Sequence, residues 1–247
     1  MTDDYVGKAN LQHLGPDWRH LQWCPYCGVT LTAENSSQDH VPSKVFLDKP
    51  YPEHLPTICC CRDCNNSFAQ AEQYLSCFLD CVLHGSTSPE AGLRPSTVGA
   101  FREVPALKDA IEDARRDDGW MLDADHAHVV AVKLARGHVS WWLNEPRLED
   151  PTGVSLQALA SLDESTRDAF ENVPQNFDLL PEVGTRALHD IFSIHGDPEE
   201  PALAPGGWRE VQEGRYRFFA FQNNAVVLVR FVIAEALAGE VYWDTTW

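Results

Sequence analysis

The sequence lacks several features that would place it in whole classes of protein. It has no apolar run of about 18 residues and no basic segment followed by an apolar one at its start, so neither a transmembrane helix nor a signal peptide is expected. None of its eight cysteines lies after Cys81, whereas the disulfides of a secreted scaffold are spread along the chain. We therefore expect a cytoplasmic protein that does not bind membranes. Its 247 residues are enough for one large domain or two modest ones.

Basic residues are also scarce. The chain has 19 Lys and Arg against 37 Asp and Glu, a net charge of −18, although proteins that bind nucleic acid through charge normally have a basic face. Residues 1–84 carry a net charge of −5, so most of the acidity lies in the remainder. An acidic surface that binds a protein partner or inhibits the chain is one explanation, and a salt-rich or GC-biased host is the other.

The cysteines that are present cluster at the spacing of metal ligands. Two Cys-x-x-Cys pairs supply four thiolates, which is what a closed tetrahedral zinc site needs. Cys59 and Cys60 compete for a place in the second pair, but only Cys61 has the required spacing to Cys64. The predicted ligands of a structural zinc are Cys24, Cys27, Cys61 and Cys64.

Strand patterns lie between the two pairs. Residues 29–32 alternate like a short strand and residues 38–41 return towards it, which predicts a small hairpin. A proline-rich loop follows, and residues 57–60 favour a brief strand leading into the second pair.

Helical periodicity begins after the second pair. Apolar residues three and four positions apart predict a helix from Asn65 to Leu83, with Gly85 as its left-handed C-terminal cap. Further on, residues 127–135 read as a helix, with a hairpin over 128–143 as the competing interpretation. The other expected elements are helices at 106–118 and 163–172, extended chain at 138–143, and strands at 216–221, 225–233 and 240–244.

The order of these parts is informative. A Cys-x-x-Cys pair precedes a strand that ends in Asp39-His40, and after a loop the second pair is followed directly by Asn65. This order resembles the HNH endonuclease superfamily, and its spacing is most similar to the zinc-stapled branch that includes recombination endonuclease VII. The resemblance covers roughly residues 20–85.

The resemblance and the patterns along the rest of the chain together predict an α+β fold in three parts. An N-terminal ββα-metal zinc module, treble-clef-like, would occupy residues 1–85, and a linker would occupy residues 86–100. Residues 101–247 would form an α+β domain that ends in a β-hairpin and binds the substrate or a partner.

The resemblance also implies roles for individual residues, and their chemistry agrees. A histidine with an ordinary pKa near 6.5 can deprotonate water at neutral pH, so His40 would be the general base. Asp39 and Asn65 would hold Mg²⁺ or Mn²⁺ through hard oxygen ligands, while the zinc would only hold the hairpin to the helix. Lys44 and Arg62 would contact phosphates of a nucleic acid, and the resemblance favours DNA over RNA.

One departure from the family keeps a second interpretation open. Members usually have an asparagine on the second strand that orients the histidine, and Thr57 stands in that region here. Thr57 partly replaces it, the histidine is oriented in another way, or the activity is weak. In the second interpretation the chain is a catalytically degenerate binding or adaptor module that acts through its acidic surface. The sequence does not predict the oligomeric state.

Other polar residues have plainer interpretations beside functional ones. Glu72 lies on the helix face of Asn65 and could be a further ligand, but a solvent-exposed glutamate is the favoured interpretation. Two groups could bind a metal, although buried packing of thiols and polarity before a helix explain them equally well or better. These groups are Cys77, Cys81 and His84, and Asp123, Asp125, His126 and His128.

Overall fold

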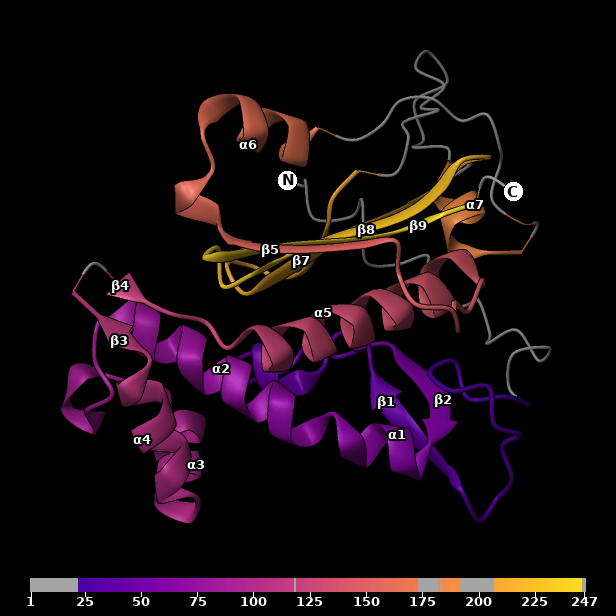
Figure 1. Cartoon of the computed structure of the whole chain (residues 1–247). Coiled ribbons are helices and arrows are strands. Elements are labelled where there is room, and N and C mark those ends of the chain that lie inside the picture. The colour runs from indigo at the N-terminus through magenta and orange to yellow at the C-terminus, as the bar shows by residue number, and fades with distance from the viewer. Residues whose placement is uncertain (1–21, 118, 173–181, 183, 192–206, 246–247) are drawn as a thin grey trace, which may run out of the picture.

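The computed structural model describes residues 22–117, 119–172, 182, 184–191 and 207–245. A five-stranded antiparallel sheet lies above helix α5 (Ala124–His138), and α5 in turn lies above helix α2 (Ala69–His84), as Figure 1 shows. A two-stranded hairpin and a short helix stand at one end of these layers.

The hairpin differs from the predicted one. Strand β1 (Ser36–His40) pairs with β2 (Thr57–Cys61) across the proline-containing loop, with Asp39 opposite Ile58. The prediction of a hairpin between residues 29–32 and 38–41 is therefore wrong. Thr30 instead forms an isolated bridge with Trp23, because this stretch folds back on the first cysteine pair.

Helix α1 (Arg62–Ser67) starts directly after β2, and α2 continues from it. The predicted helix is confirmed, including Gly85, which has φ 62° and donates its N–H to the last turn. The helix breaks at Phe68, whose ring packs edge-on against Tyr26 at a centroid distance of 5.0 Å. The hairpin and α1 thus lie next to each other at the end of α2.

The middle of the chain is helical for longer than predicted. The helix predicted at 127–135 is confirmed in α5, which excludes the competing hairpin over 128–143. Residues Val139–Leu143, expected to be extended, form a π-helical turn that continues α5. This turn packs Trp142 edge-on against Phe218 of the sheet at a centroid distance of 5.9 Å. Other elements here are α3 (Pro95–Glu103), α4 (Pro105–Asp113), and a small ribbon of β3 (Arg115–Arg116) and β4 (Gly119–Trp120).

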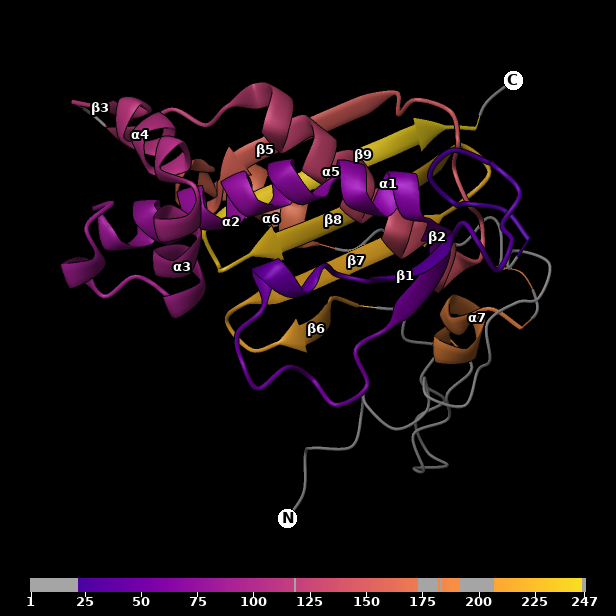
Figure 2. The same ribbon diagram turned by 90° about the horizontal axis from the view of Figure 1, so that it is seen from below.

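The large sheet has the strand order β5-β9-β8-β7-β6, and Figure 2 shows it from below with α2 and α5 across it. The predicted C-terminal strands are confirmed as β7, β8 and β9. Side chains alternate between its faces: Phe231 belongs to the core on the α5 side, and Val232 packs with Phe170 of α6. The strands are β5 (Gly153–Ala158), β6 (Arg209–Gln212), β7 (Tyr216–Gln222), β8 (Val226–Ile233) and β9 (Leu237–Asp244), and the remaining helices are α6 (Glu164–Glu171) and α7 (Arg186–Ile191).

A single large hydrophobic core joins most of these elements. Its members come from positions between Phe46 and Trp243 and include Leu75 of α2 and Leu134 of α5. The fold is thus mixed α+β, as expected. Parts of the chain predicted as two domains share this core, and the stretch predicted as a linker, 86–100, includes the start of α3. None of the helices in the described ranges has the length and apolar character that a membrane crossing requires.

Candidate metal centre and its surroundings

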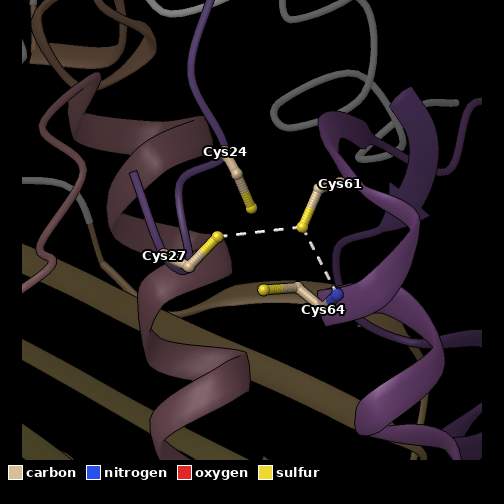
Figure 3. Close-up of side chains that lie close together, drawn as sticks. All are labelled: Cys24, Cys27, Cys61 and Cys64. Carbon is tan, nitrogen blue, oxygen red and sulfur yellow. Dashed lines mark hydrogen bonds between the residues drawn. The ribbon is translucent and has the colours of Figure 1, made fainter. Parts of the chain in front are cut away.

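The four predicted zinc ligands converge. Their sulfur atoms all lie within 4.8 Å of one another, and Figure 3 shows them turned towards a common centre from two separate stretches of chain. Residues Cys24 and Cys27 come from the turn before the hairpin, and Cys61 and Cys64 come from the junction of β2 with α1.

Each pair is shaped by its own backbone. In the first, Gly28 adopts φ 73° and donates its N–H to the Cys24 carbonyl at 2.8 Å, which closes a tight turn. In the second, Cys61 caps α1, and its sulfur accepts the N–H of Cys64 at 3.4 Å. The Cys-x-x-Cys spacing therefore sets both turns.

The arrangement fits zinc. Sulfur atoms of Cys27 and Cys61 are 3.7 Å apart, close to the edge of about 3.8 Å that a tetrahedron with 2.3 Å Zn–S bonds would have. Cys60 is not part of the four-sulfur group, and burial raises the pKa of its thiol to about 12. Four sulfur ligands leave no open position, so this centre is structural in character.

Asp39 lies in a buried ion cluster that consists of Tyr26, Asp39, Ser43, Glu72 and Lys133. The Lys133 ammonium is 3.1 Å from Oδ1 and 2.9 Å from Oδ2 of Asp39, and the Tyr26 hydroxyl donates to Oδ2 at 2.6 Å. Burial, with the Asp39 carboxylate beside it, raises the pKa of Tyr26 well above its ordinary value, so the phenol stays a donor. Both carboxylate oxygens are therefore occupied by protein donors.

His40 is the next residue along β1, and it is half-buried. Burial and the nearby Lys44 ammonium lower the pKa of its imidazole, so that the ring is neutral at pH 7. Thr57 is its direct partner in the hairpin register and is exposed.

Asn65 reaches the same strand from α1. Its side-chain nitrogen donates to Ser37 Oγ at 2.9 Å and lies 3.5 Å from the Gln38 carbonyl. Ser37 and Asp39 are two residues apart, hence on the same face of β1. The structure therefore brings the helix start close to the strand that carries Asp39.

The Asp39 carboxylate in this arrangement does not fit a divalent ion. An ammonium lies in front of both oxygens, and a cation of the size of Mg²⁺ would need about 2.1 Å to its ligands in the same space. The Asn65 amide nitrogen bonds to Ser37, and no contact joins the Asn65 side chain to the Asp39 carboxylate among the interactions of the described residues. No reaction step is therefore assigned to a metal ion at these two residues.

The predicted phosphate contacts are both at the surface. Lys44 is exposed, and its ammonium lies 5.4 Å from the centre of the Tyr51 ring, with Lys49 on the same ring at 6.0 Å. Arg62 is exposed as well and donates to the Ser36 carbonyl at 3.1 Å.

Several other candidate residues have structural roles. Glu72 was expected to be solvent-exposed, which is wrong, because its side chain is 14% exposed and bonded to Lys133 at 2.9 Å. Asp123 caps α5 by accepting the His126 N–H at 2.9 Å, as polarity before a helix predicts. Cys77 and Cys81 are buried thiols, and burial raises their pKa values to about 11 and about 12.

Sequence reasoning missed Lys133, Ser43 and Tyr26. The one available signal was a lysine in the otherwise apolar run 129–135 of α5, where it had to be buried or to break the helix face. Nothing local indicated that its partner would be Asp39.

Comparison with family models, with curated proteins and with solved structures finds no match to this chain. The resemblance to HNH endonucleases therefore rests on the residues named above, and membership of that superfamily stays a prediction.

Proposed function

We propose that the chain is an HNH-type endonuclease that hydrolyses phosphodiester bonds in nucleic acid, DNA in the first place. The observation that carries the proposal is the position of His40: a half-buried histidine, whose pKa burial lowers, at the end of a strand in a hairpin next to the four cysteines. A lowered pKa favours the neutral imidazole, which can accept a proton from water.

In this reaction His40 accepts a proton from a water molecule while the water oxygen attacks phosphorus. The bond to the leaving oxygen of the sugar breaks, and that oxygen takes a proton from solvent. Lys44 and Arg62 are exposed cations that would hold the neighbouring phosphates. A divalent ion such as Mg²⁺ or Mn²⁺ would supply charge neutralisation when bound.

The test is a plasmid-nicking assay on zinc-loaded protein with Mg²⁺, Mn²⁺ or EDTA. We expect His40→Ala to lose at least a hundredfold in rate, since general-base catalysis contributes about 10²–10⁴-fold. His54→Ala is the matched control, because His54 is an exposed histidine in the loop that joins β1 to β2. Equal nicking by wild type and His40→Ala, or no nicking with any metal, would refute the proposal.

A second function is favoured by a different observation, the engagement of Asp39 by Lys133. A carboxylate held in an internal ion pair is typical of a structural role, so the chain would be a zinc-stabilised adaptor that binds a basic protein through its acidic surface. Under this alternative the wild type nicks no nucleic acid, and Asp39→Asn changes folding stability without changing partner binding.

The setting of either function is a reducing compartment such as the cytoplasm. All eight cysteines lie within the described residues and are free thiols, which agrees with metal binding rather than with disulfides.

A further inference from the structure

Two lysines lie against one tyrosine ring in the loop that joins β1 to β2. The Lys44 ammonium is 5.4 Å and the Lys49 ammonium 6.0 Å from the centre of the Tyr51 ring, so the two charges are no more than about 11 Å apart. Both lysines are exposed, whereas Tyr51 is half-buried and packs against the main core. The ring therefore holds two cations close together at the surface of the protein.

The backbone on both sides of Lys49 is held by a residue of the large sheet. Gln212 of β6 accepts the Asp48 N–H at 2.8 Å and donates to the Asp48 carbonyl at 2.9 Å. The same amide nitrogen lies 3.4 Å from the Pro50 carbonyl. Lys49 thus extends from a backbone that is anchored before any partner binds, which reduces the entropy lost on binding.

The charges beside the two lysines are balanced in their favour, although the whole chain has a net charge of −18. Asp48, which lies between them in sequence, forms ion pairs with Arg94 at 3.6 Å and with Arg215 at 3.1 Å. Glu53 is the other carboxylate of the loop, and it lies 4.0 Å from His54. Within the described ranges neither lysine forms an ion pair, so both ammoniums are available to an anionic partner.

We propose that Lys44, Lys49 and Tyr51 form a surface that binds the phosphates of one nucleic-acid strand beside His40. The inference rests on the proposed function and deepens it, because it names the residues that hold the substrate and the part of the substrate that they hold. Lys44 is the member nearest to the proposed base, since its charge acts on the imidazole of His40.

The spacing of the two cations fits a phosphate backbone. The charges of one strand recur about every 3.4 Å along the axis of a duplex, so two ammoniums at most about 11 Å apart reach phosphates a few nucleotides apart on the same strand. Contacts of this kind fix the position of the strand and carry no sequence information. The surface should therefore bind different sequences equally.

A purely structural role for the two lysines makes a different prediction. If their contacts with the ring only fix the loop, removal of one lysine changes stability and leaves the affinity for nucleic acid unchanged. If they bind phosphates, removal of one weakens binding most at low salt, because fewer counterions are released. The salt dependence of binding therefore separates the two roles.

The experiment measures binding of a fluorescently labelled single-stranded DNA oligonucleotide to zinc-loaded full-length protein, by anisotropy and without any other divalent ion. We expect Lys49→Gln to weaken binding at low salt by about threefold or more, and to make the slope of log K against log salt shallower by about 0.7. A second oligonucleotide of unrelated sequence should show the same loss. Lys108→Gln, which removes a lysine of α4, is the matched control and should bind as the wild type does.

Two further variants test how the lysines are held. Tyr51→Leu and Gln212→Ala keep both ammoniums but remove the ring and the anchor, so both should weaken binding, whereas Tyr51→Phe keeps the ring and should not. In the plasmid assay each weakened variant should raise KM more than it lowers kcat, since neither side chain touches the reacting atoms in the proposed reaction.

The outcomes distinguish this inference from the proposed function. A wild type that binds the oligonucleotide through Lys49 but nicks no plasmid would support the surface and refute the nuclease. If Lys44→Gln and Lys49→Gln both bind and nick as the wild type does, the surface is overturned and the nuclease stands. A wild type that binds neither oligonucleotide overturns the inference as well.

Discussion

Replacement of Cys27 by serine tests the metal centre with little other disturbance. Cys27 is the exposed member of the four cysteines, so the change removes a thiolate but leaves almost no cavity. A surface substitution of this kind ordinarily changes the free energy of unfolding by no more than about 0.5 kcal/mol. A larger decrease in the free energy of unfolding would therefore result from the loss of the bound metal.

The magnitude follows from the size of the local core. The apolar cluster around the four sulfurs is separate from the main core and has four buried members, Cys24, Tyr26, Cys60 and Cys61. Structural zinc contributes roughly 10–16 kcal/mol in small zinc-binding peptides, comparable to the total stability of a domain. Loss of one ligand should thus unfold the two cysteine turns and α1, while the five-stranded sheet, with its own core, stays folded.

The assay combines zinc analysis with hydrogen exchange. Wild type should hold one zinc per chain, and Cys27→Ser should hold less than half of that after dialysis against a weak chelator. Exchange should rise in residues 22–35 and 61–67 but not in β7 or β8. Cys59→Ser is the matched control, because Cys59 lies on β2 outside the cluster. If Cys27→Ser still bound zinc tightly, or if Cys59→Ser lost as much zinc as Cys27→Ser, these four sulfurs would not be the zinc ligands.

Two further predictions concern pH. The Lys44 ammonium lowers the pKa of His40, so Lys44→Gln should raise that pKa and move the acid limb of the nicking rate to higher pH; an unchanged limb would exclude His40 as the titrating base. Burial lowers the pKa of His138 from 6.5 to about 3, so only the unfolded chain binds this proton between those values. The free energy of unfolding should therefore fall by up to about 1.4 kcal/mol per pH unit below 6.5. His138→Gln, which can still bond the Tyr216 hydroxyl, should weaken this dependence in urea titrations, and an identical slope would contradict the assignment.

Local patterns predicted the elements whose formation depends on local spacing. The apolar positions of α2 and the left-handed Gly85 cap are properties of neighbouring residues, and both were found where expected. The same holds for the cysteine turns, since Cys-x-x-Cys determines a tight turn by itself. The runs of β-forming residues in β7 and β8 also predicted their strands.

Elements that depend on distant contacts were predicted less well. The strand ending in His40 was assigned to a nearby partner, but β1 pairs with β2 across the intervening loop. Residues Val139–Leu143 contain two tryptophans and a valine, which favour a strand in isolation, yet packing of Trp142 against the sheet keeps them helical. In both cases tertiary contacts outweighed local preference.

Local sequence patterns could not predict the ion cluster, for the same reason. Lys133 and Asp39 are separated by 94 positions and meet only because α5 packs across α2. Asp39 precedes His40 on β1 and lies in sequence between the two cysteine pairs, but its immediate partner depends on the packing of α5.

This contact also bears on how far the zinc module can act alone. A fragment that ends near residue 85 would keep the four cysteines, His40 and Asn65, but it would lose α5 and with it the cation beside Asp39. It would also expose the face of α2 that carries Leu75 and Phe78, which are buried in the shared core. A buried charge that loses its partner costs about 3–5 kcal/mol, and the exposed apolar face adds to that cost. The region that resembles a nuclease therefore depends on the rest of the chain both for its stability and for the charge at its centre.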